Sequence, residues 1–376
     1  MVIADAEVIA AVEEQRAAIA DTIAFVHAHP ELAHEEHACA AHLAGRLRAG
    51  GLRVEEGIAG LETAVTATLA GGRPGGRRVG IVALYDAVAA VRPDGSVQAV
   101  HSCGHGPIAG AALGAALALA ALRDRLAGEV RVVGCPADEI HAPGTVTRGG
   151  GKWLTAAAGV WDDCDAVLYA HPEFIDTVWQ RSLWMRRDTV LLAGERSLRE
   201  GVPQPPIEAL STLASAAATF GRDELMLEHV ELDGDVEEAT GLVLRAALLL
   251  FAESEDGVER TARALRAALP AGSWQAGRLV PGIRADARVT ASVADAFAAG
   301  GRSFEPSPPA LPFATDFGSI SRRAPAALIG VGRPEGWAFH SDAGAAQFAS
   351  AAGLAIAVEI AGVLALAAVR LTAPPQ

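Results

Sequence analysis

The sequence of 376 residues is poor in cysteine, in positive charge and in long uninterrupted apolar runs. Its formal net charge of -14 provides no basic stripe for a phosphate backbone, which argues against a nucleic-acid partner. The four cysteines are too scattered for a disulfide framework, so we expect a reducing, cytoplasmic location. They are Cys39, Cys103, Cys135 and Cys164. The N-terminus becomes acidic at once and is not expected to be a signal peptide.

The longest apolar segments lie at 109–122 and 354–369. The first is shorter than a membrane span, and the second is interrupted by Glu359, so both predict buried helices and no membrane partner. Apolar residues make up 51% of the chain and charged residues 20%, which is a globular composition. A chain of this length suits two domains.

Strands alternate with helices in the first part of the chain, which predicts an α/β fold with a mostly parallel sheet. The middle third has a different rhythm, typical of an antiparallel sheet with helices. We therefore predict one domain formed by 1–184 and 293–376, interrupted by a smaller inserted α/β domain at 185–292. The expected elements of the first domain are helices within 5–50 (broken at His29-Pro30), at 109–125 and at 343–369, strands at 63–69, 79–85, 130–135 and 166–170, and a glycine-rich loop at 144–151.

The segment His101-Ser102-Cys103-Gly104-His105 is the strongest local signal for chemistry. A short turn presents residues i and i+2 together, so Cys103 and His105 could bind one metal ion. Gly104 would let the backbone approach closely. Cys-x-His also occurs by chance, and a buried cysteine is often only a small apolar residue.

Two adjacent carboxylates, Asp138 and Glu139, follow the apolar strand at 130–135. The carboxyl ends of strands are where α/β folds gather ligands, and such a pair can divide the work between metal binding and proton transfer. The alternative is a solvated acidic loop. His171 follows another apolar strand, and His340 stands in an aromatic loop before the last helix; each alone could equally be structural.

Together the motifs resemble those of the aminoacylase-type zinc metallopeptidases (peptidase family M-twenty), in particular the p-aminobenzoyl-glutamate hydrolase-like branch. The resemblance covers about residues 20 to 365. The motifs follow in the order His29-Pro30-Glu31-Leu32 with Glu35-Glu36, Tyr85-Asp86-Ala87, HSCGH, CPADE, AHPE, Ala314-Thr315-Asp316-Phe317-Gly318 and Phe339-His340-Ser341.

This resemblance implies a hydrolase that uses a metal-activated water molecule, with Asp138 as the general base and Asp86 behind the ligands. The cofactor would be one or two divalent ions, Zn or Mn, with Co also compatible. The inserted domain would act as a lid and form a homodimer, and the substrate would be a small molecule. The implied metal ligands are Cys103, His105, Glu139, His171 and His340.

The sequence departs from the family pattern around this site. Asp138 replaces Glu, Gly106 and Leu84 replace polar residues, and the usual lid histidine and asparagine are absent. His229 is the one histidine of the inserted domain, and as a strand residue it could equally be structural. Arg196, Arg199 or Arg245 could anchor an anionic substrate instead.

Three functions stay open on these grounds. The first is hydrolysis of an amide C–N bond in an N-acyl amino acid or a similar small molecule. The second is hydrolytic deamination of an arylamine or another non-peptide substrate on the same metal site. The third is a catalytically altered family member, against which the retention of all five ligand positions speaks.

Overall fold

The computed structural model describes residues 3–194, 205–221, 224–234, 242–311 and 315–374, which form two compact units. Unit 1 consists of Met1–Gln180, Ile283–Pro309 and Ser319–Gln376. Unit 2 consists of Arg181–Gly282 and Ala310–Gly318. The inserted segment thus ends at Gly282 rather than at 292. Unit 2 also contains a second, shorter segment, Ala310–Gly318.

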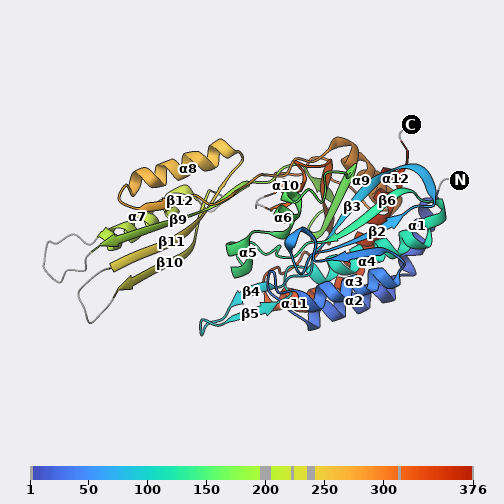
Figure 1. Cartoon of the computed structure of the whole chain (residues 1–376), viewed down its shortest axis with the longest axis horizontal. Helices are drawn as coiled ribbons and strands as arrows, with labels where there is room; N and C mark the ends of the chain where they lie inside the picture. The colour runs from blue at the N-terminus through green and yellow to red at the C-terminus, as the bar shows by residue number, and fades with distance from the viewer. Residues whose placement is uncertain (1–2, 195–204, 222–223, 235–241, 312–314, 375–376) are drawn as a thin grey trace. The chain divides into compact units, whose positions relative to one another are not determined.

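Unit 1 is built on a seven-stranded sheet (Figure 1). Its strands lie in the order β1 (Arg53–Glu56), β2 (Val65–Ala70), β6 (Ala127–Gly134), β3 (Arg73–Ala83), β7 (Ala166–Glu173), β14 (Ala326–Gly332) and β8 (Thr177–Trp179). The four central strands from β6 to β14 run parallel, and the pairs at either edge are antiparallel. This confirms the predicted α/β class with a mostly parallel central sheet.

Helices rich in alanine and glycine pack around this sheet. They are α1 (Asp5–Glu13), α2 (Arg16–Ala28), α3 (His37–Ala49), α4 (His105–Ala121), α9 (Ala287–Ala299) and α12 (Ala351–Thr372). In α4 a Cβ atom at Gly114 would press against the side chain of Ile19, so the glycine allows α2 to lie close. Among the described helices, α12 is long and apolar enough to cross a membrane, but 61% of its most apolar window is buried within the structure. It is the core helix that the sequence predicts.

Three details of unit 1 differ from the sequence prediction. The segment expected to be a glycine-rich loop contains a short helix, α5 (Pro143–Arg148), because proline is favoured at the first helical position. The last predicted helix is two helices, α11 (Asp342–Phe348) and α12, since the Ser350 hydroxyl accepts from Ala352 N and starts a new one. A hairpin of β4 (Val88–Val91) and β5 (Val97–Val100) was not predicted.

Unit 2 has an antiparallel sheet, as predicted for the insert. Its strands lie in the order β10 (Leu225–Gly234), β11 (Leu242–Ala252), β9 (Trp184–Gly194) and β12 (Ser273–Gln275), with β13 (Leu279–Val280) also paired to β9. Helices α7 (Pro205–Phe220) and α8 (Glu255–Ala268) contribute to one apolar core with one face of this sheet. The remaining described elements are α6 (Gly151–Ala157), α10 (Phe317–Ile320) and two 3-10 turns at Ile58–Gly60 and Arg123–Arg125.

Candidate metal centre

Polar side chains from four neighbouring strands meet at the carboxyl edge of the parallel sheet of unit 1. Parallel strands end at the same edge, so residues far apart in sequence come together there. The groups are Asp86 after β3, Asp138 and Glu139 after β6, His171 in β7 and His340 after β14. Cys103 and His105 join them at the start of α4.

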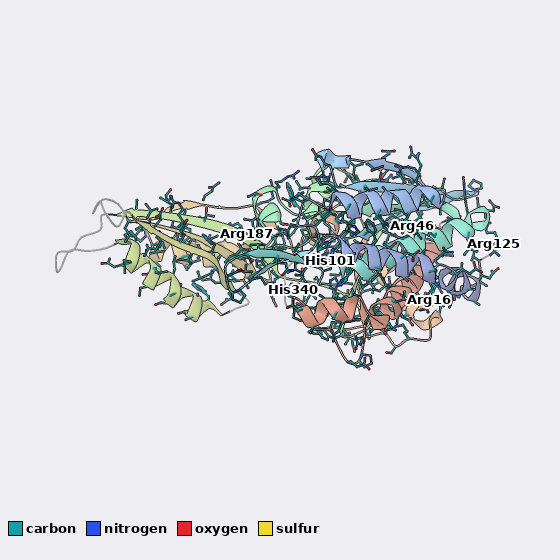
Figure 2. All side chains as sticks on the ribbon, turned by 90° about the horizontal axis from the view of Figure 1, so that it is seen from below. Arg16, Arg46, His101, Arg125, Arg187 and His340 are labelled. Atoms are coloured by element: carbon teal, nitrogen blue, oxygen red, sulfur yellow. The ribbon has the colours of Figure 1, made fainter. Side chains whose placement is uncertain are left out.

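The five predicted ligands form two overlapping clusters that share Cys103. The ligand atoms of Cys103, His105 and His171 lie within 4.8 Å of one another, and so do those of Cys103, Glu139 and His340. The backbone ties the clusters together, because His340 N donates to the carbonyl oxygen of Ser102 at 2.9 Å. Figure 2 accordingly shows His340 near His101. His340 has a φ of 56°, a strained conformation of the kind found at functional sites.

His105 is oriented by Asp86. Its Nδ1 donates to the Asp86 carbonyl oxygen at 2.8 Å, and Asp86 Oδ1 lies 2.9 Å from the same nitrogen. Burial opposes the charged imidazole, but the Asp86 carboxylate raises the pKa of His105 well above its usual value. The other nitrogen, Nε2, is buried and has no hydrogen-bond partner within the described residues. A ligand histidine is commonly held in this way, with one nitrogen fixed by an acceptor and the other open.

Glu139 carries the second buried atom without a partner. Its backbone N donates to Asp86 Oδ2 at 2.8 Å, which fixes the residue. Its Oε1 lies 3.8 Å from His105 Nε2, and its Oε2 lies 3.8 Å from His340 Nε2. Oε1 has no hydrogen-bond partner in the described part of the chain, and burial raises the pKa of Glu139 to about 7. Buried polar atoms are costly unless they are satisfied, and a cation would satisfy both this oxygen and His105 Nε2.

His171 and Cys103 offer two further donors. His171 Nδ1 donates to the Pro172 carbonyl oxygen at 2.7 Å, which leaves Nε2 facing Cys103 Sγ at 3.7 Å. Burial lowers the pKa of His171 to about 3, so the ring is neutral and can donate a lone pair. Burial and Glu139 raise the pKa of the Cys103 thiol to about 12, so metal binding would displace its proton. Sulfur, imidazole and carboxylate donors together fit a divalent ion such as Zn, Mn or Co.

Asp138 lies beside these donors but belongs to neither cluster of three. Its Oδ2 is 3.4 Å from His105 Nε2, and its Oδ1 forms an ion pair with Lys152 Nζ. The Lys152 side chain is fully buried. The sequence interpretation missed this partner, although Lys152 is the one lysine of the whole chain and directly follows the glycine-rich segment.

Glu36 holds the turn that carries Asp138. Its carboxylate accepts from the backbone N of Ala137 at 2.8 Å and of His34 at 2.9 Å, and from the Thr63 hydroxyl at 2.8 Å. Ala137 has a φ of 57°, so this turn is strained and is held from outside. The predicted motif contained Glu36, but its contact with a residue 101 positions away could not be read from it.

The predicted substrate-binding residues belong to unit 2. Arg245 on β11 lies 3.7 Å from Glu231 and 3.9 Å from Asp233, both on β10. His229 on β10 is paired with Ala247 of β11. Arg196 and Arg199 lie outside the described residues. A part in substrate binding stays a prediction for all four residues.

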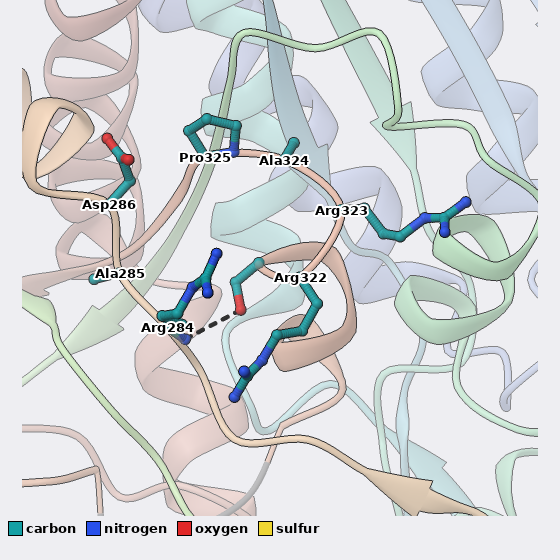
Figure 3. A pocket seen from close by; sticks show the side chains of 8 residues that line it. Arg284, Ala285, Asp286, Arg322, Arg323, Ala324 and Pro325 are labelled. Atoms are coloured by element: carbon teal, nitrogen blue, oxygen red, sulfur yellow. Dashed lines mark hydrogen bonds between the residues drawn. The ribbon is translucent and has the colours of Figure 1, made fainter.

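A polar pocket of about 180 Å³ lies in unit 1 where the chain enters α9 and β14 (Figure 3). Arg284 N donates to the Ser321 hydroxyl at 3.1 Å, and Asp286 caps α9 by accepting from Val289 N. Arg323 pairs with Asp162 at 2.7 Å. The pocket is next to the amino end of β14, whereas the metal donors are at its carboxyl side, and its lining contains no cysteine or histidine. It therefore lacks the chemistry of the metal centre.

Known proteins resemble this chain in sequence and in fold. Residues 83–365 match the model of peptidase family M20/M25/M40. One of the subunits of the p-aminobenzoyl-glutamate hydrolase of Escherichia coli is 32% identical over 174 residues, which cover 43% of this chain and 34% of that protein. The match thus spans about a third of that relative. A putative aminohydrolase from methicillin-resistant Staphylococcus aureus has a TM-score of 0.69 at 19% identity, covering 98% of this chain and 100% of its own. A dinuclear metal-binding peptidase from Bacillus subtilis has a TM-score of 0.65 at 18% identity, covering 95% and 99%.

Proposed function

Because this chain belongs to peptidase family M20/M25/M40, we propose that it is a metal-dependent hydrolase that cleaves a C–N bond. The substrate class that fits best is an N-acyl amino acid or a similar small amide. One observation carries the proposal: the buried atoms His105 Nε2 and Glu139 Oε1 lie 3.8 Å apart without hydrogen-bond partners in the described residues, within reach of Cys103, His171 and His340. A divalent cation bound there would satisfy both atoms, which supports the proposal.

The residues present divide the reaction between them. A divalent ion held by Cys103, His105, Glu139, His171 and His340 would supply Lewis acidity, lowering the pKa of coordinated water towards ~7 and polarising the scissile carbonyl. Asp138 accepts a proton from the attacking water and returns it to the leaving amine. The water oxygen becomes bonded to the acyl carbon, the C–N bond breaks, and the products are a carboxylic acid and an amine. Asp86 keeps Nδ1 of His105 protonated, so that Nε2 is the nitrogen that can donate its lone pair to the metal.

Metal analysis of the purified protein is the first test. We expect divalent metal in the wild type and a clear loss of it in Cys103→Ala, because this sulfur belongs to both donor clusters. Cys164→Ala is the matched control, since Cys164 is, like Cys103, in no disulfide bond, but it is not in either cluster. Equal metal content in wild type and Cys103→Ala would exclude the proposed site.

A screen for amine release is the second test. N-acyl amino acids and arylamines are incubated with the metal-loaded protein and with a chelated sample. Release from N-acyl amino acids alone supports amide hydrolysis. Ammonia from arylamines alone would instead indicate the deaminase alternative on the same site.

We further propose a cytoplasmic homodimer formed through unit 2. None of the four cysteines, all of which lie within the described residues, forms a disulfide bond, which agrees with a reducing compartment. In unit 2 β10 lies at an edge of the sheet, and its residues Met226 and Leu232 are 39% and 38% exposed. An edge strand with exposed apolar side chains favours pairing with a second copy. Sedimentation equilibrium would test this, with Leu232→Lys expected to weaken the dimer.

A further inference from the structure

Two adjacent carboxylates compete for the same place in the metal centre. Asp138 Oδ2 lies 3.4 Å from His105 Nε2, and Glu139 Oε1 lies 3.8 Å from the same nitrogen. Either carboxylate could therefore reach an ion bound to His105. Distance alone does not decide which of them binds metal and which acts as the base, and the shorter distance belongs to Asp138.

The partners of the two carboxylates differ. Glu139 is held by its backbone, through the bond to Asp86, and its side chain keeps a buried oxygen with no hydrogen-bond partner in the described residues. Asp138 instead has an oxygen in an ion pair with Lys152. A carboxylate already engaged by a cation is a weaker metal ligand than one with an open oxygen, because part of its charge is compensated.

Lys152 is exceptional in this sequence. The chain contains 31 lysines and arginines, and Lys152 is the one lysine. Arginine serves at every other basic position, yet here a lysine is kept with its side chain fully buried, its ammonium 5.2 Å from the ring centre of Tyr169. Burying an ammonium group is costly unless it is paired. A compact ammonium also fits where a planar guanidinium would not.

The backbone holds Lys152 in place against the carboxylate turn. Lys152 lies in the first turn of α6, next to Gly151. A Cβ atom at Gly151 would overlap the carbonyl oxygen of Pro136, two residues before Asp138. The glycine thus lets α6 pack directly on the turn, and the ammonium is fixed relative to Asp138.

We propose that Lys152 is a positioning residue that keeps Asp138 beside the metal as the base and so leaves Glu139 as the carboxylate ligand. This inference rests on the proposed hydrolase function. Lys152 binds one oxygen of Asp138, and the other oxygen faces the His105 side of the site. Without Lys152, Asp138 would be released to bind the metal itself.

A single lysine makes the ion pair directly measurable. Selective ¹⁵N labelling of lysine side chains gives one ammonium NMR signal for the whole protein, and we expect it to exchange slowly with water. In Asp138→Asn this signal should shift or disappear, whereas Asp163→Asn, whose carboxylate pairs with Arg131, should leave it unchanged. A fast-exchanging signal, or one that ignores Asp138→Asn, would overturn the proposal without any assay of activity.

The role of Lys152 in separating ligand from base is tested with cobalt. We expect the visible absorption of the Co(II)-loaded protein to change in Lys152→Met, because Asp138 then enters the coordination sphere. The double variant Lys152→Met/Asp138→Asn should return to the spectrum of Asp138→Asn alone. Identical spectra for wild type and Lys152→Met would contradict the proposal.

Kinetics on the best amide substrate complete the test. We expect Lys152→Met to lower kcat by about 100-fold with KM within about twofold, because the base is misplaced by about an ångström. In the Asp138→Asn background the same substitution should cost nothing further. Arg131→Met, which removes another largely buried cation of unit 1, should keep wild-type kcat.

Additive losses from Lys152→Met and Asp138→Asn would mean that Lys152 does not act through Asp138. A wild type that releases no amine would refute the proposed function, and the cobalt and NMR results would still decide whether Lys152 holds Asp138.

Discussion

The two units bury charged groups in opposite ways. In unit 2 they satisfy one another: Asp188 on β9 is fully buried, and its carboxylate accepts from Arg186 at 2.7 and 2.9 Å and from Arg266 at 3.3 Å. At the carboxyl edge of the sheet in unit 1, His105 Nε2 and Glu139 Oε1 are equally buried but have no hydrogen-bond partner in the described residues. The Asp188 carboxylate is thus satisfied by protein groups alone, whereas a bound cation would satisfy His105 Nε2 and Glu139 Oε1 together.

This difference shows what marks a functional site in this molecule. Buried charge occurs in both units and is therefore not a sufficient sign. Strands end in both units, but in a parallel sheet the carboxyl ends of neighbouring strands all lie at the same edge. The distinguishing feature is a group of metal-binding side chains, such as His105 fixed by Asp86, whose ligand atoms gather in one place, some of them buried without a hydrogen-bond partner in the described part of the protein.

Removing the base would have the largest effect. We expect Asp138→Asn to lower kcat by about 10²- to 10⁴-fold, because proton transfer by a positioned side chain contributes about that factor. Metal content should be retained, since Asp138 belongs to neither cluster of three donors. Kinetics and metal analysis on the same samples measure both quantities.

Asp163→Asn is the matched control, because it removes the same charge from a half-exposed aspartate paired with Arg131. It should leave kcat unchanged. If Asp138→Asn lost metal as well as activity, Asp138 would be a ligand, and the division between the two carboxylates would be wrong.

Removing the buried charge of Asp188 in unit 2 should change stability instead of activity. Asp188→Asn leaves Arg186 and Arg266 without their buried counter-charge, and breaking a buried pair in this way costs about 3 to 5 kcal/mol. We expect this loss in the free energy of unfolding of unit 2, measured in urea, with metal content unchanged. Asp233→Asn, an exposed position on β10, should show little loss. A loss of metal in Asp188→Asn would break the contrast between the units.

The sequence predicts the donors of the metal centre better than their supports. Asp138, Glu139 and His171 stand at the carboxyl ends of apolar segments that are recognisable as buried strands, and Cys103 stands just before the apolar segment that forms α4. The parallel arrangement follows from the alternation with helices, so the meeting of these ends could be expected. Roles beyond placement remain predictions for each of these residues.

The supports could not be read from the sequence because their contacts are tertiary. Glu36 bonds to Ala137, 101 positions away, and nothing local in either segment specifies the other. The short helix at Pro143–Arg148 was missed because glycine and threonine there weaken helix propensity, while Pro143 starts a helix all the same. Lys152 was visible as the one lysine of the chain, but its burial and its pairing with Asp138 depend on the fold.

Glu36 should make stability depend on pH. Burial, with Asp86 nearby, raises its pKa from 4.5 to about 7, whereas in the unfolded chain the group titrates near 4.5. Within that window the folded state holds the extra proton, so the free energy of unfolding falls as the pH rises. Glu36→Gln cannot titrate and should escape up to about 3 kcal/mol of this loss. Urea unfolding of the metal-free proteins at pH 4.5 and pH 8 measures the loss in the free energy of unfolding for each of them. Parallel pH profiles for the two proteins would contradict this account of Glu36.

The smallest effect is expected at the polar pocket of Figure 3. One of its lining residues, Arg323, pairs with Asp162. The bond lengths of 2.7 and 2.8 Å are close to the 2.7 and 2.9 Å between Arg186 and Asp188, so geometry alone would predict a similar cost. However, the two side chains are 45% and 50% exposed, and water and salt screen such a pair to about 1 kcal/mol or less. We therefore expect Arg323→Ala to change the free energy of unfolding by less than about 1 kcal/mol, and by still less in high salt. Metal content and kcat should stay at wild-type values, because the pocket lies at the amino end of β14. A loss comparable with that of Asp188→Asn would show that bond geometry, and not burial, sets the strength of ion pairs in this protein.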